Sequence, residues 1–115
     1  MDGSKALLNI AVAEWIYHWK YIGEGHRHAE NWSVGPGSRG LKRWSENYED
    51  ALELFEDMRD LYDLKGTIEI PWRLGGCWIA NLDRFDGTKK YSAFGLTLEE
   101  AIVRVCLRAF GVEVE

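Results

Sequence analysis

The segment 35–40 of the sequence, GPGSRG, matches the glycine pattern G-x-G-x-x-G of dinucleotide-binding folds. In those folds a strand leads into the glycines and a helix begins directly after them, so that backbone N–H groups of the helix face a pyrophosphate. Here the next expected helix begins near Asn47, seven residues after Gly40, and Pro36 removes one backbone donor. The pattern therefore does not predict a Rossmann-type nucleotide site.

A weaker form of nucleotide binding stays open for the same region. Basic side chains beside a glycine loop can bind a phosphate, and nearby indole rings can stack on a base. The competing interpretation is a solvated surface loop. In the ligand-binding alternative, the residues of the site are Trp32, Arg39, Lys42, Arg43 and Trp44.

Metal and nucleophile chemistry find little support in the sequence. His26 and His28 would share one face of a strand, but Arg27 between them is a poor neighbour for a dication, and a metal needs further ligands. No serine lies in a G-x-S-x-G motif, and Cys77 has no histidine nearby in the sequence. We expect a protein that is not an enzyme and that holds no metal or cofactor.

The most unusual charge pattern lies in segment 46–63, which has eight acidic residues and a single basic one, Arg59. On a helical wheel most of the acids cluster opposite an apolar stripe that contains Phe55, Met58 and Tyr62. Like charges at i, i+3 and i, i+4 destabilise a helix by a few tenths of a kcal/mol per pair, so stability alone does not favour this pattern. The candidate partner-binding residues are Glu49, Glu53, Glu56, Asp57, Asp60 and Asp63.

Two interpretations of this acidic face compete. In one, the carboxylates imitate a phosphate backbone and occupy a basic, nucleic-acid-binding groove on another protein. In the other, they only keep a small protein soluble.

Length and composition predict one folded domain over residues 1–115, with 46% hydrophobic residues and only two prolines. Cys77 and Cys106 form no C-x-x-C motif, so we expect both to be reduced packing residues in a cytoplasmic protein. No apolar run approaches the roughly 20 residues that span a bilayer, and the first residues do not resemble a signal peptide.

The elements that must position these residues follow from periodicity and capping. Helices are expected over 4–21, 47–65 and 97–110, with Asn47 and Thr97 as N-caps and with Gly66 and Gly111 as stops. Short strands are possible in the segments NWSV and LKRWS, and TIEIPW alternates like a strand, with Ile68, Ile70 and Trp72 on one face.

The clearest hairpin signal is Asp86-Gly87 between two strand-like runs, which predicts a type I′ turn and pairs Asp83 with Lys90. This register places five polar residues on one face of the sheet: Glu69, Asn81, Asp83, Lys90 and Ser92. We interpret them as solvated surface rather than as the lining of a pocket. The expected fold class is α+β: a compact, single-domain α-β sandwich whose antiparallel sheet, with its Asp-Gly hairpin, is packed by three helices.

Three segments of the chain resemble the phage ABA sandwich domain family of small phage and prophage proteins: VAEWIYHWKYI, RWSENYEDALELFEDM and LTLEEAIVRVCLRAFGVE. The resemblance implies a phage origin and an α-β sandwich, and it carries over no catalytic residues. The glycine-rich insert, Trp32 and Trp44 depart from the family pattern.

Together these features favour a small, non-enzymatic phage or prophage protein in the host cytoplasm that binds a host protein. Such a protein could inhibit host defence or nucleic-acid-handling machinery. It would do so through the acidic helix face. The alternative is a protein that binds or sequesters a nucleotide signal through the loop over 35–43. We expect no membrane partner and no direct contact with nucleic acid, and a homodimer stays open.

Overall fold

The computed structural model describes residues 3–24, 30–33, 38–39, 42–69 and 77–112. The helices are α1 (Gly3–Ala11), the π-helical turn η1 (Val12–Ile16), α2 (Tyr48–Tyr62) and α3 (Leu98–Ala109). The strands are β1 (Lys20–Glu24), β2 (Glu30–Ser33), β3 (Ser38–Arg39), β4 (Leu64–Glu69), β5 (Trp78–Arg84) and β6 (Lys90–Gly95).

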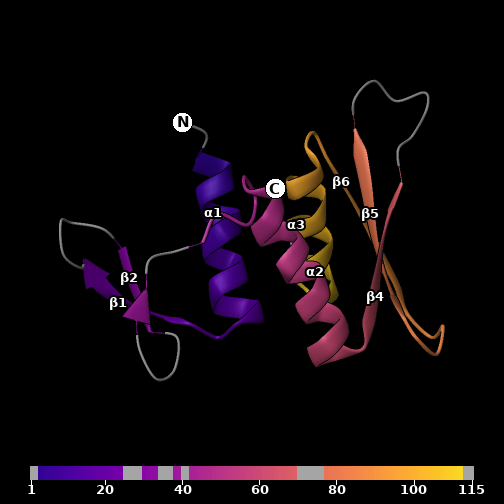
Figure 1. Ribbon diagram of the computed structural model, residues 1–115, viewed down its shortest axis with the longest axis horizontal. Coiled ribbons are helices and arrows are strands. Elements are labelled where there is room, and N and C mark those ends of the chain that lie inside the picture. The colour runs from indigo at the N-terminus through magenta and orange to yellow at the C-terminus, as the bar shows by residue number, and fades with distance from the viewer. Residues whose placement is uncertain (1–2, 25–29, 34–37, 40–41, 70–76, 113–115) are drawn as a thin grey trace.

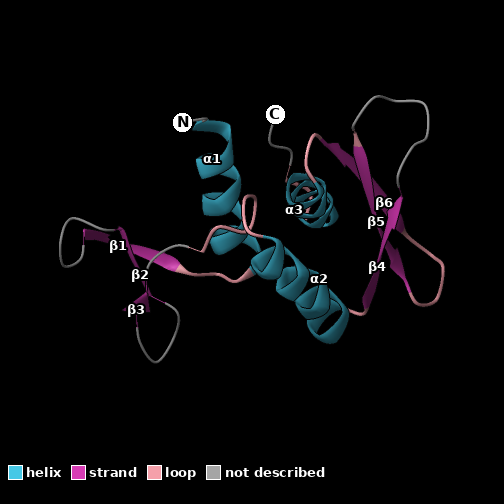
Figure 2. Ribbon diagram, turned by 45° about the horizontal axis from the view of Figure 1, so that its top comes forward, coloured by secondary structure: helices cyan, strands magenta, loops and turns pink. Residues whose placement is uncertain are grey.

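The helices lie between two antiparallel sheets, as Figures 1 and 2 show. The larger sheet has the order β4-β5-β6, and the helices cover one of its faces. The smaller sheet, β1-β2-β3, projects from the far side of α1, so the molecule is elongated, with dimensions of 45 × 33 × 22 Å. The expected α+β class, with three helices on an antiparallel sheet, is confirmed.

The core is centred on α3, which lies between the large sheet and the other helices. Six of its residues are buried: Ala101, Ile102, Val103, Val105, Cys106 and Leu107. Both ends of α3 match the sequence prediction. Thr97 Oγ1 accepts a hydrogen bond from the Glu100 N–H at 3.2 Å. At the other end Gly111, with φ of +77°, and Val112 donate back to the carbonyls of Arg108 and Leu107 in a Schellman motif.

The first helix differs from its expected range of 4–21, because regular α-helix ends at Ala11. The next turn widens into η1, in which the Tyr17 N–H reaches back to the Val12 carbonyl at 3.2 Å. The wider turn changes which residues face the core, and the large Trp15 side chain is 54% exposed. At His18 the backbone takes a φ of +58° and leaves the helix direction, and the chain continues into β1.

The second helix begins as predicted and ends earlier. Asn47 Oδ1 accepts from the Asp50 N–H at 3.1 Å, which confirms the N-cap. The stop is Asp63, in the left-handed region with φ of +56°, and not Gly66. Gly66 lies inside β4 beneath the Phe55 ring, where an added Cβ would come within 2.9 Å of ring atoms. Its small size therefore serves the packing of α2 on the sheet.

The large sheet has the predicted register at its hairpin. Asp83 pairs with Lys90, Leu82 with Tyr91 and Ala80 with Ala93. The turn type is different, because a type I′ turn needs positive φ at both central residues, and only Gly87 (φ +76°) has it. Instead the Gly87 N–H donates to the Arg84 carbonyl at 2.9 Å, and Asp86 Oδ1 accepts from the Thr88 N–H at 3.0 Å.

Three further expectations concern strands. The segment NWSV falls largely in β2, whereas the described part of LKRWS, residues 42–45, forms no strand and leads into a turn before α2. Ile68 lies in β4, but Ile70 and Trp72 are outside the described residues. The polar set Glu69, Asn81, Asp83, Lys90 and Ser92 shares the sheet face away from the helices, and no described element covers it.

Gly95 is the point of closest approach between β6 and α3. A Cβ at this position would lie 2.4 Å from the Ala101 backbone N, whereas a Cβ at Gly87 would meet nothing within 4 Å. We expect Gly95→Ala to lower the free energy of unfolding by more than about 3 kcal/mol, because backbone cannot yield as side chains do. Gly87→Ala should cost about 1–2 kcal/mol, for its positive φ alone. Urea denaturation of both variants tests this, and an equal loss would contradict the β6–α3 packing.

Candidate functional site

Five of the six predicted partner-binding residues are exposed to solvent, four on the outer face of α2 and one at its C-cap: Glu49, Glu53, Glu56, Asp60 and Asp63. The opposite face carries Ala51, Leu54 and Met58, which are fully buried. The helix therefore divides cleanly into a side that holds the fold together and a side covered with carboxylates. We call the five exposed residues the acidic face.

Two members of the acidic face contact basic side chains. Lys42 Nζ lies 2.7 Å from Glu53 Oε1, and Arg59 Nε lies 3.1 Å from Asp60 Oδ1. Exposed ion pairs of this kind contribute about 0–1 kcal/mol. The pairs therefore give only a weak stabilising reason for the acidic face.

Asp57, the sixth predicted residue, has a different environment. It is half-buried and accepts a hydrogen bond from the Tyr17 hydroxyl, which comes from the segment that follows η1. Burial, followed by the hydrogen bond to Asp57 and the negative charge of its carboxylate, raises the pKa of Tyr17 well above its ordinary value. Asp57 thus connects α2 to the N-terminal part of the chain and is not a free surface charge.

An aromatic cluster also packs where the segment after η1 meets the segment before α2. The Trp44 ring stacks on Tyr17 with centroids 5.4 Å apart, and Trp19 packs against both. Trp44 is fully buried, and next to it the Ser45 N–H donates to Asn9 Oδ1 at 2.9 Å. The base-stacking role considered for Trp44 is therefore contradicted in this conformation, because its ring is in the core.

The other residues of the ligand-binding alternative do not gather into one site with Trp44. Trp32 and Arg39 are Cα partners in the pairing of β2 with β3. Lys42 is paired with Glu53, and the Arg43 side chain is exposed. Residues 34–37, 40 and 41, which hold most of the glycine loop, lie outside the described residues.

The cysteines and histidines were the remaining candidates for nucleophilic or metal chemistry. Cys106 is buried and burial raises its pKa, whereas Cys77 is half-buried; neither is in a disulfide. His26 and His28 lie outside the described residues, and within the described part no group of three metal-ligating side chains gathers. None of the described helices is both long enough and apolar enough to cross a membrane.

The fold is similar to that of a phage protein. A 2.0 Å crystal structure of a phage protein from Bacillus cereus ATCC 14579 matches with a TM-score of 0.72 and 16% sequence identity, over 100% of this chain and 93% of that chain. No protein-family model matches the sequence, and no curated protein does. The similarity supports the expected phage-type α-β fold, whereas membership of the phage ABA sandwich family stays a prediction.

Sequence reasoning missed a hollow on the other side of the molecule, between α1, α3 and β6. Its charged side chains, Glu100, Arg104 and Arg108, follow one another at intervals of four residues on α3. That spacing was visible in the sequence as a polar line on an otherwise apolar helix. The walls could not be recognised, because they come from segments far apart in the chain.

The contact between Tyr17 and Asp57 gives a test of the junction. We expect Tyr17→Phe to destabilise the protein at pH 7 by about 1–3 kcal/mol, because the half-buried Asp57 carboxylate loses its donor. A raised tyrosine pKa means that the folded state keeps a proton that the unfolded state loses above pH 10. In the wild type, the contribution of this group to the free energy of unfolding should therefore be fully present below pH 10 and decline above it.

Denaturation curves between pH 7 and pH 11 measure both effects. The decline above pH 10 should be shallower in Tyr17→Phe than in the wild type. Tyr48→Phe, at an exposed position on α2, is the control and should behave like the wild type. Identical pH dependence in Tyr17→Phe and the wild type would argue against the buried contact.

Proposed function

We propose that this chain is a small phage or prophage protein that binds a basic surface of a host protein through the acidic face of α2. The observation that carries the proposal is the division of α2 into a buried side and a side of five exposed carboxylates. The fold similarity to a phage protein supports the phage origin.

A purely solubilising role explains the acidic face less well. The face contains like-charged neighbours at i, i+3 and i, i+4, among them Glu49 with Glu53 and Glu56 with Asp60, and each such pair opposes helix formation. Solubility does not require that the charges be concentrated on one helix, because charge spread over the surface serves it equally. Concentrated charge of one sign is what speeds the encounter with an oppositely charged partner.

The geometry also supports a class of partner. At about 1.5 Å per residue, the carboxylates from Glu49 to Asp60 extend over about 16 Å of helix, and Asp63 follows at the C-cap. A straight line of negative charge of this length resembles a short stretch of phosphate backbone. A host protein with a nucleic-acid-binding groove is the partner that fits, and an effect on host defence or nucleic-acid handling would follow from occupying that groove.

Charge reversal on and off the face tests the proposal. Glu56→Lys with Asp60→Lys changes the face, and Glu14→Lys with Glu69→Lys changes two exposed acids elsewhere. Each reversal adds two charges, so both variants have a formal net charge of −1 instead of −5. All four sites are exposed, so stability should stay within about 0.5 kcal/mol of the wild type.

The readout is capture of host proteins by each immobilised variant, with the captured proteins identified by mass spectrometry. We expect the wild type to retain a basic host protein that is released by added salt or by competing DNA. The variant on the face should retain it at least tenfold less, and the variant off the face should retain it as the wild type does. Equal retention by both variants would overturn the proposal.

A further inference from the structure

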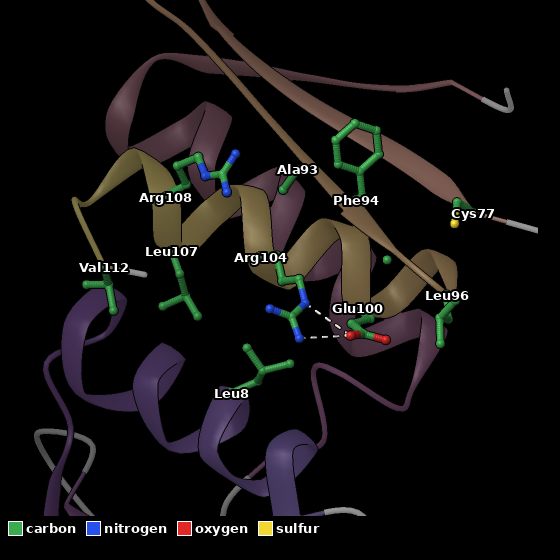
Figure 3. A pocket seen from close by; sticks show the side chains of 11 residues that line it. Leu8, Cys77, Ala93, Phe94, Leu96, Glu100, Arg104, Leu107, Arg108 and Val112 are labelled. Atoms are coloured by element: carbon green, nitrogen blue, oxygen red, sulfur yellow. Dashed lines mark hydrogen bonds and ion pairs between the residues drawn. The ribbon is translucent and has the colours of Figure 1, made fainter. Parts of the chain in front are cut away.

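The hollow between α1, α3 and β6 has a volume of about 430 Å³, which is within the size range of small-molecule sites. Leu8 of α1, Ala93 of β6 and Leu107 of α3 lie at its floor and are almost fully buried, whereas Val112 beyond α3 is half-buried. Figure 3 shows these side chains around the opening, with Cys77 near one end.

The rim of the hollow is unusually apolar for a surface. Phe94 is 57% exposed and Leu96 is 74% exposed, and both line the opening. Large apolar side chains are costly to leave in water, and when they gather beside a concave site they provide contact area for a ligand.

The charged residues of the hollow follow one line on α3. Both Nε and Nη2 of Arg104 lie 3.0 Å from Glu100 Oε1, and the two side chains are only 23% and 16% exposed. Figure 3 shows Arg104 directed from α3 toward Leu8. A partly buried ion pair is often no more stabilising than apolar residues of similar size, so the pair is weak evidence for a role in stability alone.

Arg108, one turn further along α3, adds a second guanidinium. Its Nη1 donates to the Ser92 carbonyl at 2.6 Å, which holds the side chain beside β6. A guanidinium has five N–H donors, so this bond leaves most of them able to bind a ligand. The described side chains that line the hollow include two arginines and one glutamate, so these residues together carry a net positive charge although the whole chain is acidic.

We propose that this hollow binds a small organic anion, with an apolar, aromatic body against the exposed rim residue Leu96 and its acidic group at the exposed Arg108 guanidinium. Guanidinium groups recognise both carboxylates and phosphates through paired N–H donors. The exposed Phe94 ring packs on the ligand body from the rim. This site is distinct from the acidic face and from the loop over 35–43, and it does not depend on the proposed host partner.

The two cysteines provide a built-in reporter. Cys77 is half-buried and lines the hollow, whereas Cys106 is fully buried and burial raises its pKa. A thiol reagent applied to the folded protein should therefore modify Cys77 and leave Cys106 unmodified. A ligand in the hollow should slow the modification of Cys77.

The probe is 1-anilinonaphthalene-8-sulfonate, which joins an aromatic body to one acidic group and fluoresces when it leaves water. We expect micromolar binding to the folded protein and at least a fivefold slower reaction of Cys77 with iodoacetamide. 1-Naphthoate and 1-naphthyl phosphate should displace the probe, and their relative affinities distinguish a carboxylate ligand from a phosphate ligand. Neutral 1-naphthamide should compete at least tenfold less well.

Arg108→Glu should weaken binding of the probe at least tenfold, whereas the matched control Arg59→Glu on α2 should leave it unchanged. Because Arg108 also bonds to β6, a second variant, Leu96→Glu, places the repelling charge on an exposed rim residue with no role in the core. Probe binding that neither protects Cys77 nor responds to Leu96→Glu would overturn the proposal. Equal competition by the amide and the two anions would also overturn it.

Discussion

Burial of α3 on most of its circumference is the constraint on which the rest of the structure depends. The helices α1 and α2, the turn η1 and the strands β5 and β6 all pack against it. Its contact with β6 is so close that Gly95 lies almost against the Ala101 backbone. The line of Glu100, Arg104 and Arg108 is polar, and the hollow opens where that line lies. The position of the proposed ligand site is thus a consequence of how the core is built.

The orientation of α2 follows from two sets of contacts. Its inner side packs on α3 and β4, and the aromatic cluster around Trp44 holds the chain on the side of η1. The Tyr17 hydroxyl donates to the Asp57 carboxylate, and the Tyr62 hydroxyl donates to the Ile16 carbonyl at 2.9 Å. Two hydrogen bonds therefore join α2 to the end of η1 and the residue after it. With these contacts made, the acidic face can point only toward solvent. Its carboxylates are therefore available to a partner without any rearrangement of the fold.

Local signals in the sequence were enough to predict much of the fold. Caps at Asn47 and Thr97, the stop at Gly111 and the hairpin register depend on residues close together in the chain, and all are confirmed. The end of the first helix and the role of Gly66 depend on distant partners, since the half-buried Tyr17 and Trp19 pack against Trp44 and Phe55 covers Gly66. The site shows the same contrast. Helical periodicity alone predicted the exposure of Glu49 and Glu56, but Asp57 is bonded to a tyrosine 40 residues away.

Hydrogen exchange measured residue by residue on the native protein tests most directly whether α3 organises the fold. If it does, the amides of the segment 102–107 should exchange only when the whole protein unfolds, and their protection should equal the free energy of unfolding measured with denaturant. The amides of β1 and β2, which project away from the core, should exchange through local openings of lower free energy. Protection in α3 that falls well below the global value, or below that of the β5–β6 hairpin, would contradict this organisation.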